Sequence, residues 1–120
     1  MSQAVRFRVR QVGHVAVVDL EGDLTHDSET PLQAAMRDPH VSSRGHVLLN
    51  FSPVGYINSA GISLLVSLIA GNRENPGKLI ACSLSPHYEK IFRMVGLSSY
   101  LPTFDSESAA LQALETSAPA

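Results

Sequence analysis

The chain has 120 residues, of which 44% are hydrophobic and 17% charged, a composition that supports one domain with its own core and excludes a disordered tail. Nine Lys and Arg residues against eleven Asp and Glu residues give a net charge of −2 without a basic cluster, so we expect no nucleic acid partner. No apolar run approaches the ~18 residues of a membrane-spanning helix, and a single cysteine without a signal peptide indicates a reducing, cytoplasmic setting and no membrane partner.

Two Val-rich segments open the chain, residues 5–12 and 14–21, and they predict a pair of strands around Gly13. Because side chains alternate between the two faces of a strand, three arginines of the first segment share one face. These arginines are Arg6, Arg8 and Arg10. We interpret this face as solvated, with a docking surface as the alternative.

The next element is a helix delimited by polar residues and prolines. Asp27 or Ser28 is expected to cap it, and Pro31 fits its first turn. It should run to about Asp38, because Pro39 prevents its continuation.

The middle of the chain predicts a strand followed by a second helix. Residues 46–51 (HVLLNF) are a continuous apolar run, which is typical of a central strand. From Ile62 onward, apolar residues recur at i, i+3, i+4 and i+7 and mark a helix from near Ala60 to Gly71 or Asn72.

The last third of the chain predicts four more elements. They are a strand over 78–83, a helix over 85–96, a short strand over 100–104 and a helix from Ser106, capped by Asp105 or Ser106. Ser85 and Pro86 match an N-cap followed by a first-turn proline, and residues 117–120 are expected to fray.

The element order β β α β α β α β α predicts an α/β fold. We expect one domain over residues 1–120, with an ordered core over about 4–116, a mixed sheet of about four to five strands and about four helices. Strand–helix–strand alternation implies right-handed crossovers and parallel pairing. Function should then reside on loops and element ends.

Residue types that can carry catalysis or hold metals are present, but their spacing does not match that of a known catalytic or metal-binding motif. The five histidines lack the spacing of a metal site, and no glycine-rich nucleotide loop occurs. Cys82 lies in an apolar strand and is interpreted as a small core residue. We therefore expect no enzymatic activity, no cofactor and no metal.

The stretch YINSAGISLL, residues 56–65, places a hydroxyl at the junction between a strand-like run and a helix. One interpretation is that Asn58 or Ser59 caps the helix and that Gly61 permits close packing on the sheet. The other is that Ser59 is a phosphorylation site, since a phosphate there would carry about −1.5 to −2 charges at a helix N-terminus, which favours negative charge. Such a phosphate would leave the fold intact and change what docks on this surface.

The segment from His46 to Leu114 resembles the STAS domain of bacterial anti-sigma factor antagonists. That family has a V-L-D-L strand, a D-S-[ST]-G junction, a G-K turn, a helix ending in G-L and a D-S-x-x-x-A-L finish. The matching residues here are Val47–Asn50, Asn58–Gly61, Pro76–Lys78, Gly96–Leu97 and Asp105–Leu111. Upstream, VVDLEGDL resembles the family's L-x-G-x-L segment, so nearly the whole chain is covered.

The resemblance implies that Ser59 is the serine that a partner kinase phosphorylates and that a PP2C-type phosphatase restores. Three residues depart from the family pattern: Asn58 and Thr25 replace aspartates, and Ala60 replaces a second hydroxyl residue. Losing the aspartate at position 58 removes a carboxylate that would repel the phosphate, and it also removes a group that a kinase can recognise. The first effect favours phosphorylation and the second opposes it, and the sequence does not rank the two.

The resemblance further implies a phosphorylation-switched binding module, monomeric or weakly dimeric. Unmodified, it would bind an anti-sigma factor with a histidine-kinase-like ATPase fold, and phosphate on Ser59 would release that partner. The loops after the second and third strands should lie side by side and form the binding surface. Its expected residues are Asp23, Thr25, Asn58, Ser59, Ala60, Gly61 and Ser63. The alternative is a structural STAS subunit of a signalling scaffold or lipid transporter that is never phosphorylated.

Overall fold

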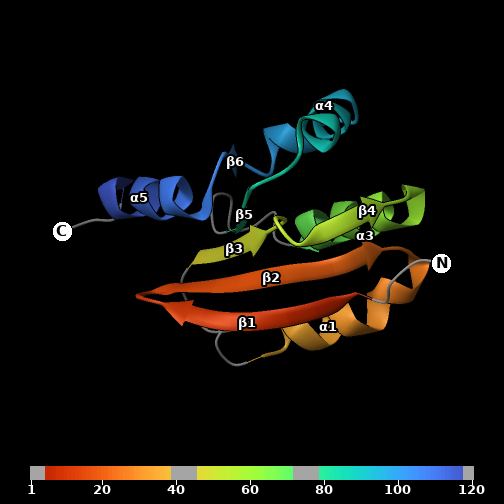
Figure 1. The fold of residues 1–120 in the computed structure, drawn as a ribbon, viewed down its shortest axis with the longest axis horizontal. Helices are drawn as coiled ribbons and strands as arrows, with labels where there is room; N and C mark the ends of the chain where they lie inside the picture. Colours follow the sequence, from red (N-terminus) through yellow and green to blue (C-terminus); the bar gives the residue numbers. More distant parts are fainter. Residues whose placement is uncertain (1–4, 39–45, 72–78, 118–120) are drawn as a thin grey trace.

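The computed structural model describes residues 5–38, 46–71 and 79–117. Within these ranges six strands form one mixed sheet in the order β1-β2-β3-β5-β6, with β4 paired to β2 beside this path (Figure 1). The strands are β1 Arg6–Val12, β2 Val15–Leu24, β3 His46–Asn50, β4 Val54–Ile57, β5 Leu79–Cys82 and β6 Thr103–Phe104. The helices are α1 Glu29–Met36, α3 Ser59–Gly71, α4 Pro86–Met94 and α5 Glu107–Ser117, with 3-10 turns η1 His26–Ser28 and η2 Leu97–Ser99.

The expected α/β architecture is confirmed by the sheet and its helices. β1 and β2 pair antiparallel, whereas β2, β3, β5 and β6 follow one another in parallel. β3 lies between β2 and β5, so the apolar run at 46–51 does form the central strand. Ser85 caps α4 by accepting a hydrogen bond from the Tyr88 N–H at 3.3 Å, and Ser106 caps α5 in the same way through Ala109 at 3.0 Å.

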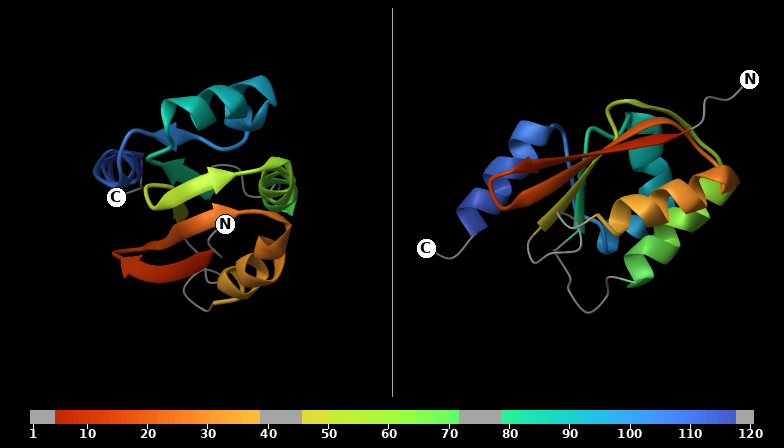
Figure 2. Two further views of the ribbon diagram at one scale, coloured as in Figure 1. Left: turned by 45° about the vertical axis from the view of Figure 1, so that its right-hand side comes forward. Right: turned by 90° about the horizontal axis from the view of Figure 1, so that it is seen from below.

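The core has two parts because β2 presents apolar side chains to both faces of the sheet. Ala16, Val18 and Leu20 join the larger cluster, which includes residues of α3 and α4 and has Met36 of α1 packed against it. Val15 and Val17 point the other way, into a smaller cluster completed by α5. Figure 2 shows α1 and α3 together on one side of the sheet and α5 apart from them.

Three strands differ from the sequence-based expectation by more than one residue at either end. β4 was not expected, since its four residues include a glycine and an exposed tyrosine and its pairing with β2 is tertiary. β2 extends to Leu24 rather than residue 21, because β4 gives its last residues a partner. β6 has only two residues, and Tyr100 belongs to the turn before it.

The start of the first helix also differs from expectation. Thr25, and not Asp27, is the capping residue, and it caps the turn η1: its Oγ1 accepts from the Asp27 N–H at 3.3 Å. Ser28 directly precedes α1 without capping it, and α1 ends at Met36, two residues before Asp38. Pro39, Asn72, the Pro76–Lys78 segment and residues 118–120 lie outside the described residues.

Close contact between α3 and the end of β2 depends on Gly61. A Cβ at this position would collide with the Leu24 carbonyl, lying 2.9 Å from its carbon and in still closer contact with its oxygen. Real Cβ atoms do not approach backbone so closely, so only glycine fits without movement of the helix. The expectation that Gly61 permits close packing on the sheet is confirmed.

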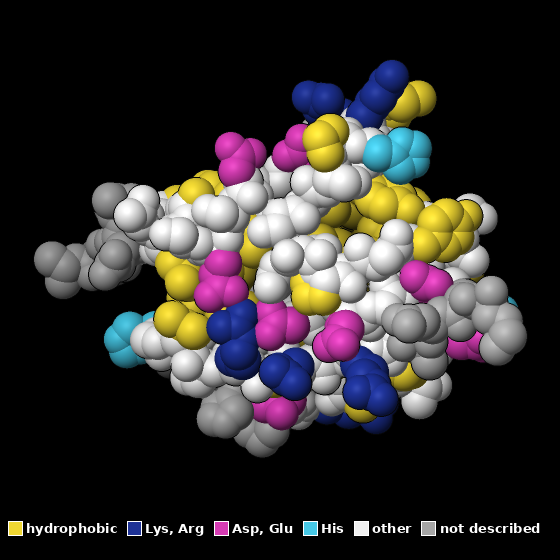
Figure 3. Space-filling model, viewed as in Figure 1, with side chains coloured by type: hydrophobic (Ala, Val, Ile, Leu, Met, Phe, Trp, Pro, Cys, Tyr) yellow, Lys and Arg dark blue, Asp and Glu magenta, His cyan; other side chains and the backbone are white. Residues whose placement is uncertain are grey.

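A charged cluster joins β1, β2, β3 and α5 on the sheet face that Figure 3 shows, where basic and acidic side chains alternate. Arg10 donates to both oxygens of Asp19, at 2.7 and 2.9 Å, and to Glu107 at 2.6 Å. Asn50 donates to Asp19 at 2.7 Å. These hydrogen bonds, above all those from Arg10, hold the pKa of Asp19 below its ordinary value. Arg10 is therefore not purely solvated, whereas Arg6 and Arg8 are exposed as expected.

We expect Gly61→Ala to lower the free energy of unfolding by about 1–3 kcal/mol, the usual cost of overpacking a closely packed site. The matched control is Gly71→Ala in the same helix, where a Cβ would meet nothing within 4 Å. The control should leave stability unchanged or raise it slightly, because alanine favours helix. Urea unfolding followed by circular dichroism measures both, and equal stabilities of the two variants would contradict the assigned contact.

We expect Asp19→Asn to destabilise the fold by about 1 kcal/mol at pH 7, a modest value because Arg10 is 36% exposed and water screens the pair. Since the folded-state pKa of Asp19 is depressed, its contribution is present above the unfolded-state value of about 3.9 and is lost as the pH falls through the folded-state pKa. The stability gap between wild type and variant should therefore close below about pH 4. Urea unfolding at pH values above and below about 4 measures this gap. The control is Glu21→Gln, which removes an exposed carboxylate on the same strand, and a gap for Asp19→Asn that does not change with pH would refute the prediction.

Candidate functional site

Two connections meet at one end of the sheet, the turn after β2 and the junction between β4 and α3. β2 and β4 are parallel, with Leu24 opposite Ile57, so the segments that follow the two strands leave the sheet at the same end. The Asn58 N–H donates to the Leu24 carbonyl at 3.1 Å and fixes the two connections to each other. The turn after the second strand and the segment before α3 therefore do lie side by side, but β4, which the sequence did not predict, and not the third strand, brings the segment there.

Asn58 is the N-cap of α3. Its Oδ1 accepts a hydrogen bond from the Gly61 N–H at 2.9 Å, and its carbonyl accepts from the Ile62 N–H at 2.9 Å. This leaves Ser59 as the first helical residue, exposed, with its hydroxyl unpaired among the residues that the structure describes. Of the two capping candidates, the structure therefore selects Asn58 and leaves the serine hydroxyl available.

The facing turn is held by its own hydrogen bonds. Ser28 is 1% exposed; its Oγ accepts from the Thr25 N–H at 2.9 Å and donates to the Asp23 carbonyl at 3.3 Å. Together with the Thr25 cap, these bonds form a reciprocal capping box. The turn is therefore a defined surface beside Ser59 rather than a loose loop.

The seven predicted surface residues take different roles in this geometry. Ser59 and Ser63 are exposed on α3, whereas Asp23, Thr25, Asn58 and Ala60 are half-buried around the junction. Gly61 is buried against Leu24, so it is not itself part of the exposed surface; it allows α3 to lie close to β2. Sequence periodicity could place Ser63 one turn beyond Ser59, but its exposure comes from the packing of α3.

The electrostatics of the junction favour an anion. The first N–H groups of a helix have no intrahelical acceptor, and α3 has thirteen residues aligned behind them. The end of β2 and the turn after it carry the carboxylates of Asp23 and Asp27; that of Asp27 lies 3.1 Å from Nε2 of His26, and the side chains of this pair are exposed. Ser59 thus occupies a position where added negative charge meets backbone donors.

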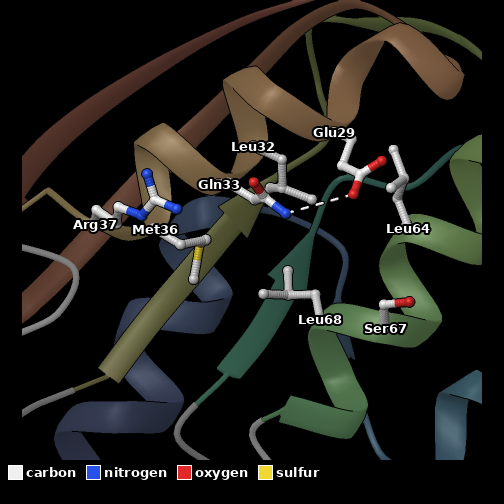
Figure 4. Close-up of a pocket in the computed structure, with 8 residues that line it drawn as sticks. All are labelled: Glu29, Leu32, Gln33, Met36, Arg37, Leu64, Ser67 and Leu68. Atoms are coloured by element: carbon white, nitrogen blue, oxygen red, sulfur yellow. Dashed lines mark hydrogen bonds between the residues drawn. The ribbon is translucent and has the colours of Figure 1, made fainter.

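An apolar groove of about 410 Å³ separates α1 from α3 (Figure 4). Its lining residues are Glu29, Leu32, Gln33, Met36, Arg37, Leu64, Ser67 and Leu68. Gln33 donates to Glu29 at 3.5 Å along the rim. Because both helices begin at the junction, the groove runs away from Ser59 and adds an apolar surface beside the polar one.

The described residues hold no metal-binding cluster, and their one cysteine is buried. No group of three or more His, Cys, Asp or Glu residues within them could hold a metal ion. Cys82 is fully buried, as expected of a core residue, and burial raises the pKa of its thiol. No helix within residues 5–38, 46–71 and 79–117 has the length and apolar character needed to cross a membrane.

Comparisons with known proteins show which family shares this sequence and fold. BtrV of Bordetella bronchiseptica, which bears the name of an anti-sigma factor antagonist, is 24% identical over 115 residues, covering 96% of this chain and 99% of its own. An anti-sigma factor antagonist from Mycobacterium paratuberculosis has the same fold, with a TM-score of 0.76 at 21% identity over 93% of this chain and 95% of its own. The phosphorylated form of SpoIIAA, a Bacillus cell fate determinant, superposes with a TM-score of 0.67 at 21% identity over 90% and 98% of the two chains. The model of the STAS domain family matches residues 6–110, and on this match the chain belongs to the STAS domain family.

Proposed function

We propose that this protein is an anti-sigma factor antagonist whose hold on its partner is switched by phosphorylation of Ser59. The observation behind the proposal is that Asn58 caps α3, which leaves the neighbouring Ser59 exposed. A hydroxyl without a structural hydrogen bond can be modified at little cost to the fold. The names of BtrV and of the Mycobacterium protein support the class of function.

The switch acts through charge added next to the uncharged side chains of Thr25, Asn58 and Ala60. A phosphate on Ser59 adds about −1.5 to −2 charges, and the free N–H groups of the first turn of α3 stabilise it. A partner shaped around the small hydroxyl would then have to desolvate that charge, which is costly without a matching cation. Phosphorylation would therefore weaken binding without unfolding the domain.

Asn58 and Thr25 adapt the junction to this chemistry. Asn58 caps through its amide oxygen, so the acceptor serine has no carboxylate as its immediate neighbour. Thr25 is likewise uncharged and caps its own turn. Both neutral residues reduce repulsion of a phosphate, which favours a long-lived phosphorylated state.

The partner class follows from the same proposal. The unmodified protein would bind an anti-sigma factor with a histidine-kinase-like ATPase fold, which also phosphorylates it, and a PP2C-type phosphatase would restore the serine. We place these events in the cytoplasm and assign the protein a binding role rather than an enzymatic one, as a monomer or weak dimer. The docking surface comprises Asp23, Thr25, Asn58, Ser59, Ala60 and Ser63, with Gly61 beneath it.

The first test is the position of the phosphate. Incubation with the cognate kinase and ATP should add one phosphate, mapped by intact mass and peptide sequencing to Ser59. Ser63 is the internal comparison, because it is also exposed on α3 but lies one turn inside the helix. Phosphate on Ser63 or on Ser52, or no phosphate at all, would contradict the proposal.

The second test separates binding from stability. Ser59→Asp should weaken partner binding at least tenfold, about 1.4 kcal/mol, while the same carboxylate in the first turn of α3 changes stability by only about 0.3 to 1 kcal/mol. Calorimetric titration and thermal melting measure the two effects. Ser59→Ala should bind like wild type and resist switching.

The matched control is Ser99→Asp, which adds the same charge to the exposed turn η2 after α4. It should leave partner binding unchanged. Loss of the fold in Ser59→Asp would make Ser59 structural. Full binding by a folded Ser59→Asp variant would instead favour the alternative of a permanent structural STAS subunit.

A further inference from the structure

β4 is a short strand with a partner on one side. It pairs with β2, and in a strand successive N–H groups point to opposite sides. The Asn58 N–H points toward β2, where it donates to the Leu24 carbonyl at 3.1 Å. The Ile57 N–H therefore points off the opposite edge of β4.

The acceptor for that outward N–H is the side chain of Tyr88, 31 residues further along the chain. The Ile57 N–H donates to the Tyr88 hydroxyl oxygen at 2.9 Å. The two consecutive N–H groups of Ile57 and Asn58 are thus held from opposite sides, one by α4 and one by β2. Ser59 is the next residue.

Tyr88 is itself well fixed. It lies in the first turn of α4, whose start is set by the Ser85 cap and by proline at its first position. Its ring packs against the larger core cluster and lies edge-on to His87, with 5.0 Å between ring centroids. Further along α4, the fully buried Phe92 packs edge-to-face on Phe51 at 6.0 Å. The hydroxyl therefore projects from an anchored helix.

A hollow of about 220 Å³ lies beside this hydrogen bond, between β4 and α4, where apolar side chains gather in Figure 3. Its lining residues are Phe51, Ser52, Val54, Gly55, Ile57, Ser83, Leu84, Ser85 and Tyr88. Side chains do not fill the space next to β4, so packing alone does not fully restrain that strand on its α4 side. The Tyr88 hydroxyl supplies a directional restraint where packing is incomplete.

We propose that Tyr88 is a positioning residue for Ser59, which holds the acceptor in place through the backbone of Ile57. This inference rests on the proposed role of Ser59 as phosphate acceptor. Phosphoryl transfer depends on alignment of the attacking hydroxyl, and small displacements of a reacting group are costly. Without the Tyr88 hydroxyl, the Ile57 backbone loses its restraint on the α4 side, and the Ile57–Ser59 segment samples more orientations about its remaining contacts with β2, α3 and the core.

The test uses Tyr88→Phe, which removes one oxygen and keeps the ring in the core. The matched control is Tyr100→Phe, which removes the hydroxyl of a 67% exposed tyrosine away from β4. Hydrogen exchange followed by NMR should show the Ile57 amide exchanging about threefold to tenfold faster in Tyr88→Phe, as expected for loss of one hydrogen bond. The control should match wild type, and both variants should melt close to wild type.

Kinetics with the cognate kinase and ATP provide the functional measurement. Tyr88→Phe should lower kcat for Ser59 by a similar factor of about threefold to tenfold with little change in KM, because the docking surface is intact and only the acceptor is less well aligned. Unchanged exchange at Ile57 and unchanged kcat in Tyr88→Phe would overturn the inference. A wild-type chain that the kinase does not modify would overturn the proposed function instead, and the exchange rate of Ile57 would still decide whether Tyr88 restrains this backbone.

Discussion

The carbonyl group of Leu24 is the point on which the site depends. Its oxygen accepts the Asn58 N–H at 3.1 Å, and the same carbonyl lies so close to Gly61 that no side chain fits there. The end of β2 therefore fixes both the residue before Ser59 and the residue two positions after it. The first turn of α3 is held against the sheet, and Ser59 within this turn is exposed.

This constraint assigns separate roles to neighbouring residues that share a loop. Asn58 satisfies the helix terminus, Gly61 allows the contact, and Ser59 is left without a structural task. A reversible charge placed on such a residue changes recognition more than stability, because no native hydrogen bond has to break. The neutral Thr25 on the facing turn adds no repulsion. The geometry thus suits a switch that changes partners while the fold persists.

The fold and the element that carries the candidate site were largely predictable from the sequence, whereas the detailed geometry around Ser59 was not. Periodicity at α3, the cap before α4 and the apolar run of β3 are local signals, and each reports an element that exists. β4 was not predicted as an element of its own, because a four-residue strand containing Gly55 forms only where β2 offers an edge. The choice between Asn58 and Ser59 as cap, and the Tyr88–Ile57 hydrogen bond, depend on where distant segments come together in space. Tyr88 in particular appears in the sequence as an ordinary residue of an amphipathic helix.

The central claim is that Ser59 can carry a phosphate while the start of α3 stays as it is. The most direct measurement is the NMR spectrum of the chain phosphorylated at Ser59 compared with the unmodified chain, together with hydrogen exchange of the Asn58 and Gly61 amides. We expect shift changes confined to the turn after β2 and the first turn of α3, with both amides still protected. Loss of protection at Asn58 and Gly61, or shift changes spread through β3 and β5, would show that the phosphate breaks the contact with Leu24 and would contradict the account.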